Sequence, residues 1–551
     1  MTNPIPDVAN AECLLIVGSN LAENHPIVAG WVLDAKDRGA KVIVADPRLT
    51  PTAWMADLFL QMVPGSDIAL INSLINVVIR EGLYNAEFVE KNTTGFDDLR
   101  RLVAEYSPDL VEGITGVPRE HIEQAARWFA QARASAIIYC MGITQHTKGN
   151  DNVMDLSNLA VICGHIGRPG TGVLPLRGQN NVQGACDMGA LATLLPGYVS
   201  VADDAGRERV AAGFGVVHRG GYASSPRAQA LPSKPGLTVV EMMSAAAARA
   251  LKALYIMGED PIVSDPNSRH VEEGLKKLEF VVVQDIFMTD TARLADVVLP
   301  AACWAEKEGT VTGTERRVQW ISKAVEPPGE AKADLEIVRA VAHRLGFGPM
   351  FSRETAEEVL SEINRVVPAY AGITAERVRS TVGGIHWPCP SFDHPGTPIL
   401  HTSGFKTADG KAKLVPVGHR SPAEPTSDEF PLLLTTGRVV MHYNSGSMTR
   451  RTKALMRRAP FLFVEMNPAD AGRLGVEANS EVKVVTKRGT VIARAVITPS
   501  IREGVVFMPF HFPGANALTV DALDPKAKIP EYKVAACRVE RGNGVRGSGS
   551  A

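Results

Sequence analysis

Two stretches of the chain follow one pattern, a strand, a helix and a second strand, and no other feature limits the possible folds as strongly. In 13–47 the apolar runs CLLIVGSN and KVIVADP bracket a helix expected over 26–38. In 254–285 the runs LYIMGED and FVVVQD bracket a helical stretch over 267–278. Strands that alternate with helices are typical of parallel sheets. The sequence therefore predicts an α/β protein with two Rossmann-like parallel-sheet units.

The strands of the two units also end in the same way. Gly18 and Asp46 close the strands of the first unit, 28 residues apart, and Gly258 and Asp285 close those of the second, 27 apart. Open parallel sheets bind ligands beyond the carboxyl ends of their strands. An aspartate there can accept hydrogen bonds from ribose hydroxyls or from the N–H edge of guanine, or it can merely cap a helix or a turn. The turn after the first strand lacks G-x-G-x-x-G, which argues against an ordinary NAD site. The pattern predicts two nucleotide-like sites, or one ligand with two nucleotide heads.

The remaining sequence changes character twice. Between 290 and 425 it mixes helices, expected over 333–345 and 355–366, with connections rich in proline and glycine. From 426 the runs PLLLTTGR, FLFVEMN, SEVKVVTKRGTVIARAVIT and GVVFMPFHFP are typical of short strands, with a hairpin around Lys487–Gly489. We expect five parts: an α/β domain over 1–178, a second over 179–310, a connecting helical and irregular region over 311–425, a β-barrel over 426–542 and a disordered tail over 543–551.

Composition excludes several functional classes. A net charge of −2 provides no electrostatic footprint for nucleic acid. No apolar window of about 18 residues occurs, which argues against membrane insertion. The seven cysteines form no C-x-x-C pair, so the chain offers neither a zinc site nor an iron–sulfur binding run. An odd number of scattered cysteines is typical of reduced thiols, and we expect a cytoplasmic protein.

One loop fits no periodic pattern. PLRGQNNVQGACDMGA (175–190) has neither the period of an amphipathic helix nor the alternation of a half-buried strand. It combines a single cation, Arg177, with amide side chains at Gln179, Asn180, Asn181 and Gln183. The composition indicates a loop with a function beyond folding.

Several stretches, in order along nearly the whole chain, carry a resemblance to a known family. They are GSNLAENHPI (18–27), MGITQHTKGNDNV (141–153), GHIGRPGTGVLPLRGQNNVQGACDMGAL (164–191), YIMGEDP (255–261), VVQDIFMTDTARLADVVLP (282–300) and TGTERRVQ (312–319). They resemble the catalytic (alpha) subunit of molybdenum- or tungsten-dependent formate dehydrogenases, within the molybdopterin oxidoreductases. RGQNNVQG, with MGITQ upstream, is the part that indicates formate dehydrogenase rather than the wider family.

The resemblance implies a bis(molybdopterin guanine dinucleotide) cofactor that holds molybdenum or tungsten, which agrees with two nucleotide-like sites. Asn and Gln suit a pterin because they supply paired donors and acceptors without net charge. The C-terminal barrel, of the double-psi type, would close over the cofactor. The implied cofactor contacts are Gly18, Asn20, Asp46, Gln145, Gln179, Asn180, Gly258, Asp285, Thr436, Gly437, Arg438, His442, Asn516, Tyr532 and Lys533.

The implied reaction is the two-electron oxidation of formate to carbon dioxide. Formate has almost no apolar area, so polar contacts must orient it, and a guanidinium binds a carboxylate through two parallel hydrogen bonds. Arg177 matches the family's formate-orienting arginine, and His146 is the second candidate catalytic residue. Cys186 is expected to be a small packed residue rather than a metal ligand.

In the family, an iron–sulfur module with a [4Fe–4S] cluster and the cysteine or selenocysteine that binds the metal precede the position matching Met1. No cysteine of this chain matches them, so no metal ligand is predicted. We expect the preceding part to be a separate chain, or to be separated by an in-frame UGA codon in a selenocysteine enzyme. The chain alone is then expected to show little or no activity. Its expected partners are formate and the N-terminal part or other subunits that carry electrons.

Two alternatives stay open on the sequence. Nitrate is also a small planar anion, so another molybdopterin oxidoreductase such as a nitrate reductase could use the same arginine. The chain could also be a non-catalytic cofactor-binding fragment that needs a separate N-terminal chain.

Overall fold

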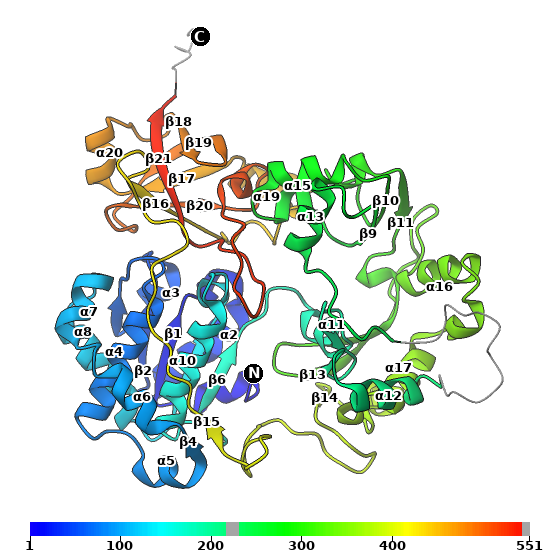
Figure 1. Ribbon diagram of the computed structural model, residues 1–551, viewed down its shortest axis with the longest axis horizontal. Helices are drawn as coiled ribbons and strands as arrows, with labels where there is room; N and C mark the ends of the chain where they lie inside the picture. The colour runs from blue at the N-terminus through cyan, green and yellow to red at the C-terminus, as the bar shows by residue number, and fades with distance from the viewer. Residues whose placement is uncertain (216–230, 543–551) are drawn as a thin grey trace. The chain divides into compact units, whose positions relative to one another are not determined.

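The computed structural model describes residues 1–215 and 231–542 (Figure 1). The disordered tail expected at 543–551 lies outside the described residues. The chain forms two compact units. The first combines Met1–Leu176, Asp260–Glu272 and Ile399–Ala551, and the second combines Arg177–Glu259 and Glu273–Pro398. The five-part division expected from the sequence stays a prediction.

The first unit contains a five-stranded parallel sheet in the order β3-β2-β1-β5-β6. Its strands are β1 (Cys13–Val17), β2 (Lys41–Ala45), β3 (Leu58–Leu60), β5 (Ser135–Tyr139) and β6 (Gly172–Pro175). Every pair of neighbours is parallel. Every residue of β1 and β5 is buried, as expected where helices cover both faces of a parallel sheet. The strands predicted in 13–47 are confirmed.

Alternate residues of these strands feed two separate hydrophobic cores. Leu15 packs in one core with residues of helices α4 (Asp67–Arg80) and α8 (Arg119–Gln131). Leu14 and Ile16 pack in the other core with helix α2 (Pro26–Asp37). Since successive side chains of a strand point to opposite faces, one apolar run serves both layers. The rigid sheet fixes where its strands end, and the loops at those ends build the site.

The first unit also contains a closed six-stranded barrel. Its strands are β16 (Leu432–Gly437), β17 (Phe463–Met466), β18 (Glu481–Thr486), β19 (Gly489–Ile497), β20 (Val505–Pro509) and β21 (Ala535–Arg541). Strands β18 and β19 form an antiparallel hairpin whose last pair is Thr486 with Gly489. The predicted barrel and its hairpin are both confirmed.

The second unit contains a three-stranded parallel sheet, in the order β11-β10-β9. Its strands are β9 (Ala253–Met257), β10 (Phe280–Asp285) and β11 (Val297–Pro300). A small antiparallel sheet follows, made of β12 (Gly309–Thr312), β13 (Arg317–Ile321) and β14 (Ile385–His386). Helices α16 (Asp334–Arg344) and α17 (Ala356–Val366) confirm the helices predicted in this unit, and α15 (Ser268–Leu275), most of which belongs to the first unit, confirms the helix predicted between β9 and β10.

One face of the β9–β10–β11 sheet carries several exposed apolar side chains, although Gln284 on the same face is buried. Val282 pairs with both Tyr255 and Val297, so these side chains and their alternate neighbours share a face. On that face Tyr255, Met257, Phe280 and Val297 are 43%, 48%, 46% and 37% exposed. Parallel sheets normally have both faces covered. This open apolar face is unusual for such a sheet.

Among the described residues, no helix combines the length and the apolar character that crossing a bilayer requires.

Candidate functional site

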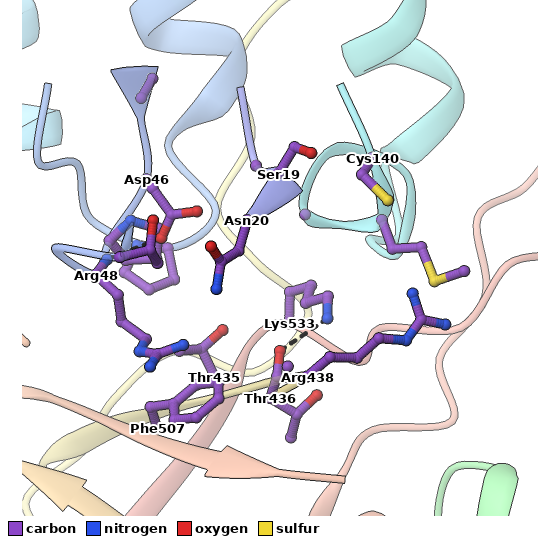
Figure 2. A pocket seen from close by; sticks show the side chains of 18 of the residues that line it. Ser19, Asn20, Asp46, Arg48, Cys140, Thr435, Thr436, Arg438, Phe507 and Lys533 are labelled. Carbon is purple, nitrogen blue, oxygen red and sulfur yellow. Dashed lines mark hydrogen bonds between the residues drawn. The ribbon is translucent and has the colours of Figure 1, made fainter. Parts of the chain in front are cut away.

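A pocket with about 830 Å³ of empty space, part of it open to solvent, lies in the first unit where β1, β2 and β5 end (Figure 2). The strand ends contribute Ser19 and Asn20 after β1 and Asp46 and Arg48 after β2, and Cys140 follows β5. The barrel contributes Thr435, Thr436 and Arg438 from the end of β16, Phe507 from β20, and Lys533 before β21.

Two glycines let the ends of β1 and β5 touch backbone to backbone. The amide of Gly142 donates to the carbonyl oxygen of Gly18 at 3.0 Å. A Cβ atom on Gly142 would lie 2.5 Å from the Cα atom of Gly18. Gly18 itself has a φ of +55°, which favours glycine. This wall of the pocket therefore has no room for a side chain at either position.

Two carboxylates line the pocket. Asp46 accepts a hydrogen bond from the amide of Arg48 at 2.9 Å. Burial raises the pKa of the Asp46 carboxyl to about 6, although Arg48 opposes the shift. Burial likewise raises the pKa of Asp67, in the first turn of α4, against the opposing effect of His146 and Lys148. The Oδ2 atom of Asp67 is buried without a hydrogen-bond partner. Both groups can accept N–H donors from a ligand.

Three cationic side chains line the same pocket. Arg48 is held by Glu465 through hydrogen bonds of 2.8 and 3.0 Å and lies 3.7 Å from the centre of the Phe507 ring. Arg438 donates through Nη2 to Asn444 at 2.8 Å, while its Nε atom is buried without a partner. Lys533 donates to the carbonyl oxygen of Thr436 at 2.7 Å (Figure 2). Three such cations suit a phosphorylated ligand.

The second unit repeats the local geometry of the first. The amide of Gly18 donates to the carbonyl oxygen of Ala45 at 3.0 Å, and the amide of Gly258 donates to that of Gln284 at 2.8 Å. Asp46 accepts from the amide two residues later at 2.9 Å, and so does Asp285, from the amide of Phe287. Gly258 has a φ of +63°, close to that of Gly18. The repeat proposed from the Gly-to-Asp spacing is thus matched hydrogen bond by hydrogen bond.

A sequence signature that the spacing argument missed extends this repeat. DPRLTPTAWMADLFL (46–60) and DIFMTDTARLADVVL (285–299) share D-x-x-x-T-x-T-A-x-x-A-D-x-x-L. In each, the first threonine caps the turn, with Ala53 donating to Thr50 at 3.2 Å and Ala292 to Thr289 at 3.1 Å. The second aspartate, Asp57 or Asp296, accepts from the second residue of the neighbouring strand at 2.8 and 2.7 Å. Self-comparison of the sequence would have found it.

In the amide-rich loop, a hydrogen-bonded chain holds Arg177. Its Nε atom donates to Gln183 Oε1 at 3.0 Å, and its Nη1 atom contacts Cys186 Sγ at 3.4 Å. Gln183 in turn donates to Asp187 Oδ1 at 2.7 Å. Asp187 also accepts from the hydroxyls of Tyr198 and Tyr370. Sequence reasoning missed the contacts of Gln183 and Asp187, since Tyr370 lies 183 residues from Asp187 and no local pattern contains that pairing.

The other predicted loop residues differ in exposure. Gln179 and Asn180 are exposed. Asn181 accepts a hydrogen bond from the amide of Thr312 at 2.8 Å, which ties the loop to strand β12. Gln179 and Asn180 as cofactor contacts stay predictions.

The residues predicted in the barrel fall into two groups. Thr436, Gly437, Arg438 and Lys533 line the pocket, together with Gly18, Asn20, Asp46 and His146 from the sheet. The remaining candidates of the first unit make structural contacts. His442 bonds Thr449 and the carbonyl oxygen of Ala459, Asn516 and Tyr532 donate to carbonyl oxygens of Val263 and Ser264, and Gln145 accepts from the amide of Tyr532.

The lining residues that sequence reasoning missed include Ser19, Arg48, Asp67 and Phe507. Ser19 follows the predicted Gly18 directly and Arg48 lies two residues after the predicted Asp46, so a wider window at each strand end would have included them. Asp67 opens a helix and Phe507 lies in a barrel strand. Only the tertiary fold brings them to the pocket.

Known protein families match two long segments of this chain. A family model described as molybdopterin oxidoreductase matches residues 1–344. The chain belongs to this family. A second model, described as a molydopterin dinucleotide binding domain, matches residues 432–536, which make up most of the barrel. The family explains why a barrel and strand ends line one pocket, and it supports a molybdopterin cofactor.

Several relatives within the family match nearly the whole chain. An F420-dependent formate dehydrogenase alpha subunit from Methanocaldococcus jannaschii is 50% identical over 98% of this chain and 78% of its own length. Formate dehydrogenase H from Escherichia coli is 41% identical over 98% of this chain and 74% of its own. The assimilatory nitrate reductase catalytic subunit of Bacillus subtilis is 37% identical over 98% and 76%.

A solved structure supports the fold. Acetylene hydratase from Pelobacter acetylenicus superimposes with a TM-score of 0.74 at 22% identity, over 98% of this chain and 81% of that chain.

The pocket fits the dinucleotide that the family binds. Ser19 Oγ and Arg438 Nε are buried polar atoms without a protein partner, so both can bond a ligand. The three cations suit a diphosphate, and Asp46 and Asp67 can accept from a base. Among the described residues, no three His, Cys, Asp or Glu side chains gather into a metal-binding group.

Proposed function

We propose that this chain is the catalytic part of a formate dehydrogenase, which oxidises formate to carbon dioxide and a proton. The observation that carries the proposal is 50% identity to a formate dehydrogenase alpha subunit over 98% of the chain, against 37% for a nitrate reductase. The held Arg177 in the amide-rich loop supports the same substrate class.

Arg177 orients the substrate in this proposal. Formate offers two oxygens on one carbon, and a planar guanidinium can donate to both. Gln183 and Asp187 fix the plane of the guanidinium before the substrate arrives. Donors that are held in place before the substrate binds reduce the entropy cost of binding and reaction. The contacts of His146, the other candidate catalytic residue, support a positioning role instead.

The cofactor proposed is a bis(molybdopterin guanine dinucleotide) with molybdenum or tungsten. Two guanine ends match two strand ends that carry an aspartate in the same geometry, Asp46 and Asp285. Arg48, Arg438 and Lys533 would hold the diphosphate of the first dinucleotide. When bound, the group would supply the acceptor for the two electrons that the oxidation of formate to carbon dioxide and a proton releases. A [4Fe–4S] cluster belongs to the part of the family that precedes the matching segment.

Further parts of the enzyme complete the proposal. Electrons leave through an N-terminal part or through other subunits, as the alpha-subunit names of the relatives suggest. We infer a cytoplasmic location from the seven cysteines, all of which are free thiols.

Dye-linked assays of the complete, cofactor-loaded enzyme test the function. Formate should reduce an oxidised viologen dye, and nitrate should not oxidise the reduced dye. Nitrate turnover without formate turnover would identify a nitrate reductase instead. No turnover of either substrate, in enzyme with full metal and guanine content, would reject both and favour a non-catalytic cofactor-binding role.

A further inference from the structure

His146 belongs to a buried charged cluster in the wall of the pocket. His146, Lys148, Asp67 and Glu531 are at most 5% exposed. The Nδ1 atom of His146 lies 2.7 Å from Glu531 Oε1, and its Nε2 atom bonds the carbonyl oxygen of Gly142 at 2.9 Å. Asp67 Oδ2 lies 3.8 Å from the same Nε2 atom. The cluster joins the loop after β5 to the segment that precedes β21.

The partners of the two ring nitrogens determine the charge of His146. A peptide carbonyl can only accept, so Nε2 must carry a proton. The Nδ1 atom and Glu531 Oε1 lie 2.7 Å apart without the alignment of a hydrogen bond, and two unprotonated atoms would repel at this distance, so one of them carries a proton. Glu531 Oε2 already accepts from the amide and the hydroxyl of Thr147 at 3.0 and 3.1 Å. These bonds favour the ionised carboxylate. The second proton therefore belongs to the imidazole.

Two other buried histidines show the opposite pattern. His165 donates through Nε2 to the carbonyl oxygen of Phe129 and accepts through Nδ1 from Arg168. His511 donates to the carbonyl oxygen of Asn444 and accepts from the amide of Val439. One donor and one acceptor on each ring require the neutral form. Burial correspondingly lowers the pKa of each to about 4.

We propose that His146 is a positioning residue, held as an imidazolium, that fastens segment 531–533 to the loop after β5. The contacts beside it show what the fastening controls. The amide of Tyr532 donates to the carbonyl oxygen of Gln145 at 3.2 Å, and the next residue is Lys533, which lines the pocket. The amide of Gly142, whose carbonyl oxygen bonds His146, donates to the carbonyl oxygen of Gly18 in the wall of the pocket. The imidazolium thus holds in place Lys533, which is a cation of the site, and the Gly142 backbone, which forms part of the pocket wall.

The charges around His146 favour its cationic form. Burial opposes a charged imidazole, but Glu531 and then Asp67 outweigh it and raise the pKa of His146. Lys148 is the second buried cation of the cluster, and it donates to the carbonyl oxygens of Gly65 and Arg420. Two carboxylates thus face two cations. All four side chains belong to this chain, so the role proposed for His146 does not depend on the identity of the substrate.

Nuclear magnetic resonance tests the charge directly. In the full chain with histidine-selective ¹⁵N labelling, His146 should show two protonated ring nitrogens at pH 7.5. His165 and His511 should each show one, and the spectrum of His146→Gln assigns the signal. An unprotonated nitrogen on His146 at this pH would overturn the proposal. In Glu531→Gln the titration midpoint of His146 should fall by at least about 1 pH unit, and an unchanged midpoint would overturn the pairing.

Hydrogen exchange tests the fastening. His146→Gln should speed exchange of the Tyr532 amide at least about 10-fold. The matched control His165→Gln also replaces a buried histidine and should leave that amide unchanged. Unchanged exchange in His146→Gln would overturn the positioning role, and if this variant does not fold, Glu531→Gln gives the same test. No readout involves formate or cofactor, so failure here is distinct from failure of the proposed function.

Discussion

Arg177 is the residue through which the proposed function is tested most directly. Its guanidinium donates to Gln183 and contacts Cys186. Lysine keeps the charge but loses the planar pair of donors. We expect Arg177→Lys to raise KM for formate about 10–100-fold, because one bidentate contact becomes a point charge. Steady-state kinetics of the loaded enzyme measure this.

The control for this substitution is Arg353→Lys. Arg353 forms a partly exposed ion pair with Glu362 at 3.4 Å, in the same unit but in a connecting region. Its KM should be unchanged. Equal effects of both substitutions would contradict a substrate-orienting role for Arg177.

Asp46 should lower the stability of the folded chain without cofactor and strengthen the binding of the cofactor. Its folded pKa of about 6 exceeds the ordinary value of 3.8 because of burial. The folded state therefore binds more protons between pH 4 and 6, and stability falls as the pH rises through this window. We expect Asp46→Asn to remove the part of this fall that Asp46 contributes, while the part due to Asp67 persists, and to stabilise the chain without cofactor by about 1–3 kcal/mol at pH 7.5. Denaturant titrations at pH 4.5 and 7.5 measure it.

The same substitution should weaken cofactor retention. Asparagine keeps the oxygen that accepts from Arg48, but it presents an N–H group where guanine N–H donors would meet a carboxylate. Released guanine should fall in Asp46→Asn and, through the repeated geometry, in Asp285→Asn. Full guanine content in both variants would contradict the role proposed for the two aspartates.

At the scale of elements, Gly18 and Gly258 form a matched pair. Both have left-handed φ values, +55° and +63°. A Cβ atom on Gly18 would lie 2.7 Å from the backbone of Gly142, whereas nothing lies within 4 Å of one on Gly258. Gly258→Ala should cost about 1–2 kcal/mol for its conformation alone. Gly18→Ala should cost at least about 3 kcal/mol because the backbone must also move. Thermal unfolding of both variants decides, and equal losses would show that the close contact does not matter.

The sequence predicted elements well wherever a local pattern defined them. The apolar runs of β1, β2, β9 and β10 and the hairpin of β18 and β19 all form as predicted. The site was only partly predictable. Arg48 is held by Glu465, which is 417 residues away, and no local pattern contains that pairing. Asp67 looks like any acidic residue in the first turn of a helix. Only the fold brings it to His146.

At the scale of the whole molecule, the exposed apolar side chains of the β9–β10–β11 sheet are expected to promote association between molecules in solution. Four apolar side chains share this face, and exposed apolar surface of this kind promotes association. We expect the double variant Met257→Lys and Phe280→Lys to lower binding of the dye ANS and to reduce aggregation. Both positions are nearly half exposed, so the thermal midpoint should hardly change.

The matched control is Leu345→Lys with Val382→Lys, which are 67% and 101% exposed and lie outside this sheet. This control should leave dye binding unaltered. If the sheet variant binds as much dye as the parent chain, the dye site lies elsewhere.

The wedged contact between Gly18 and Gly142 also has an evolutionary consequence. The two copies of the turn share their hydrogen bonds, but only the first lies against another backbone. The two positions should therefore tolerate substitution unequally. Position 258 can accept asparagine or a small side chain at modest cost, whereas position 18 cannot change unless position 142 moves with it.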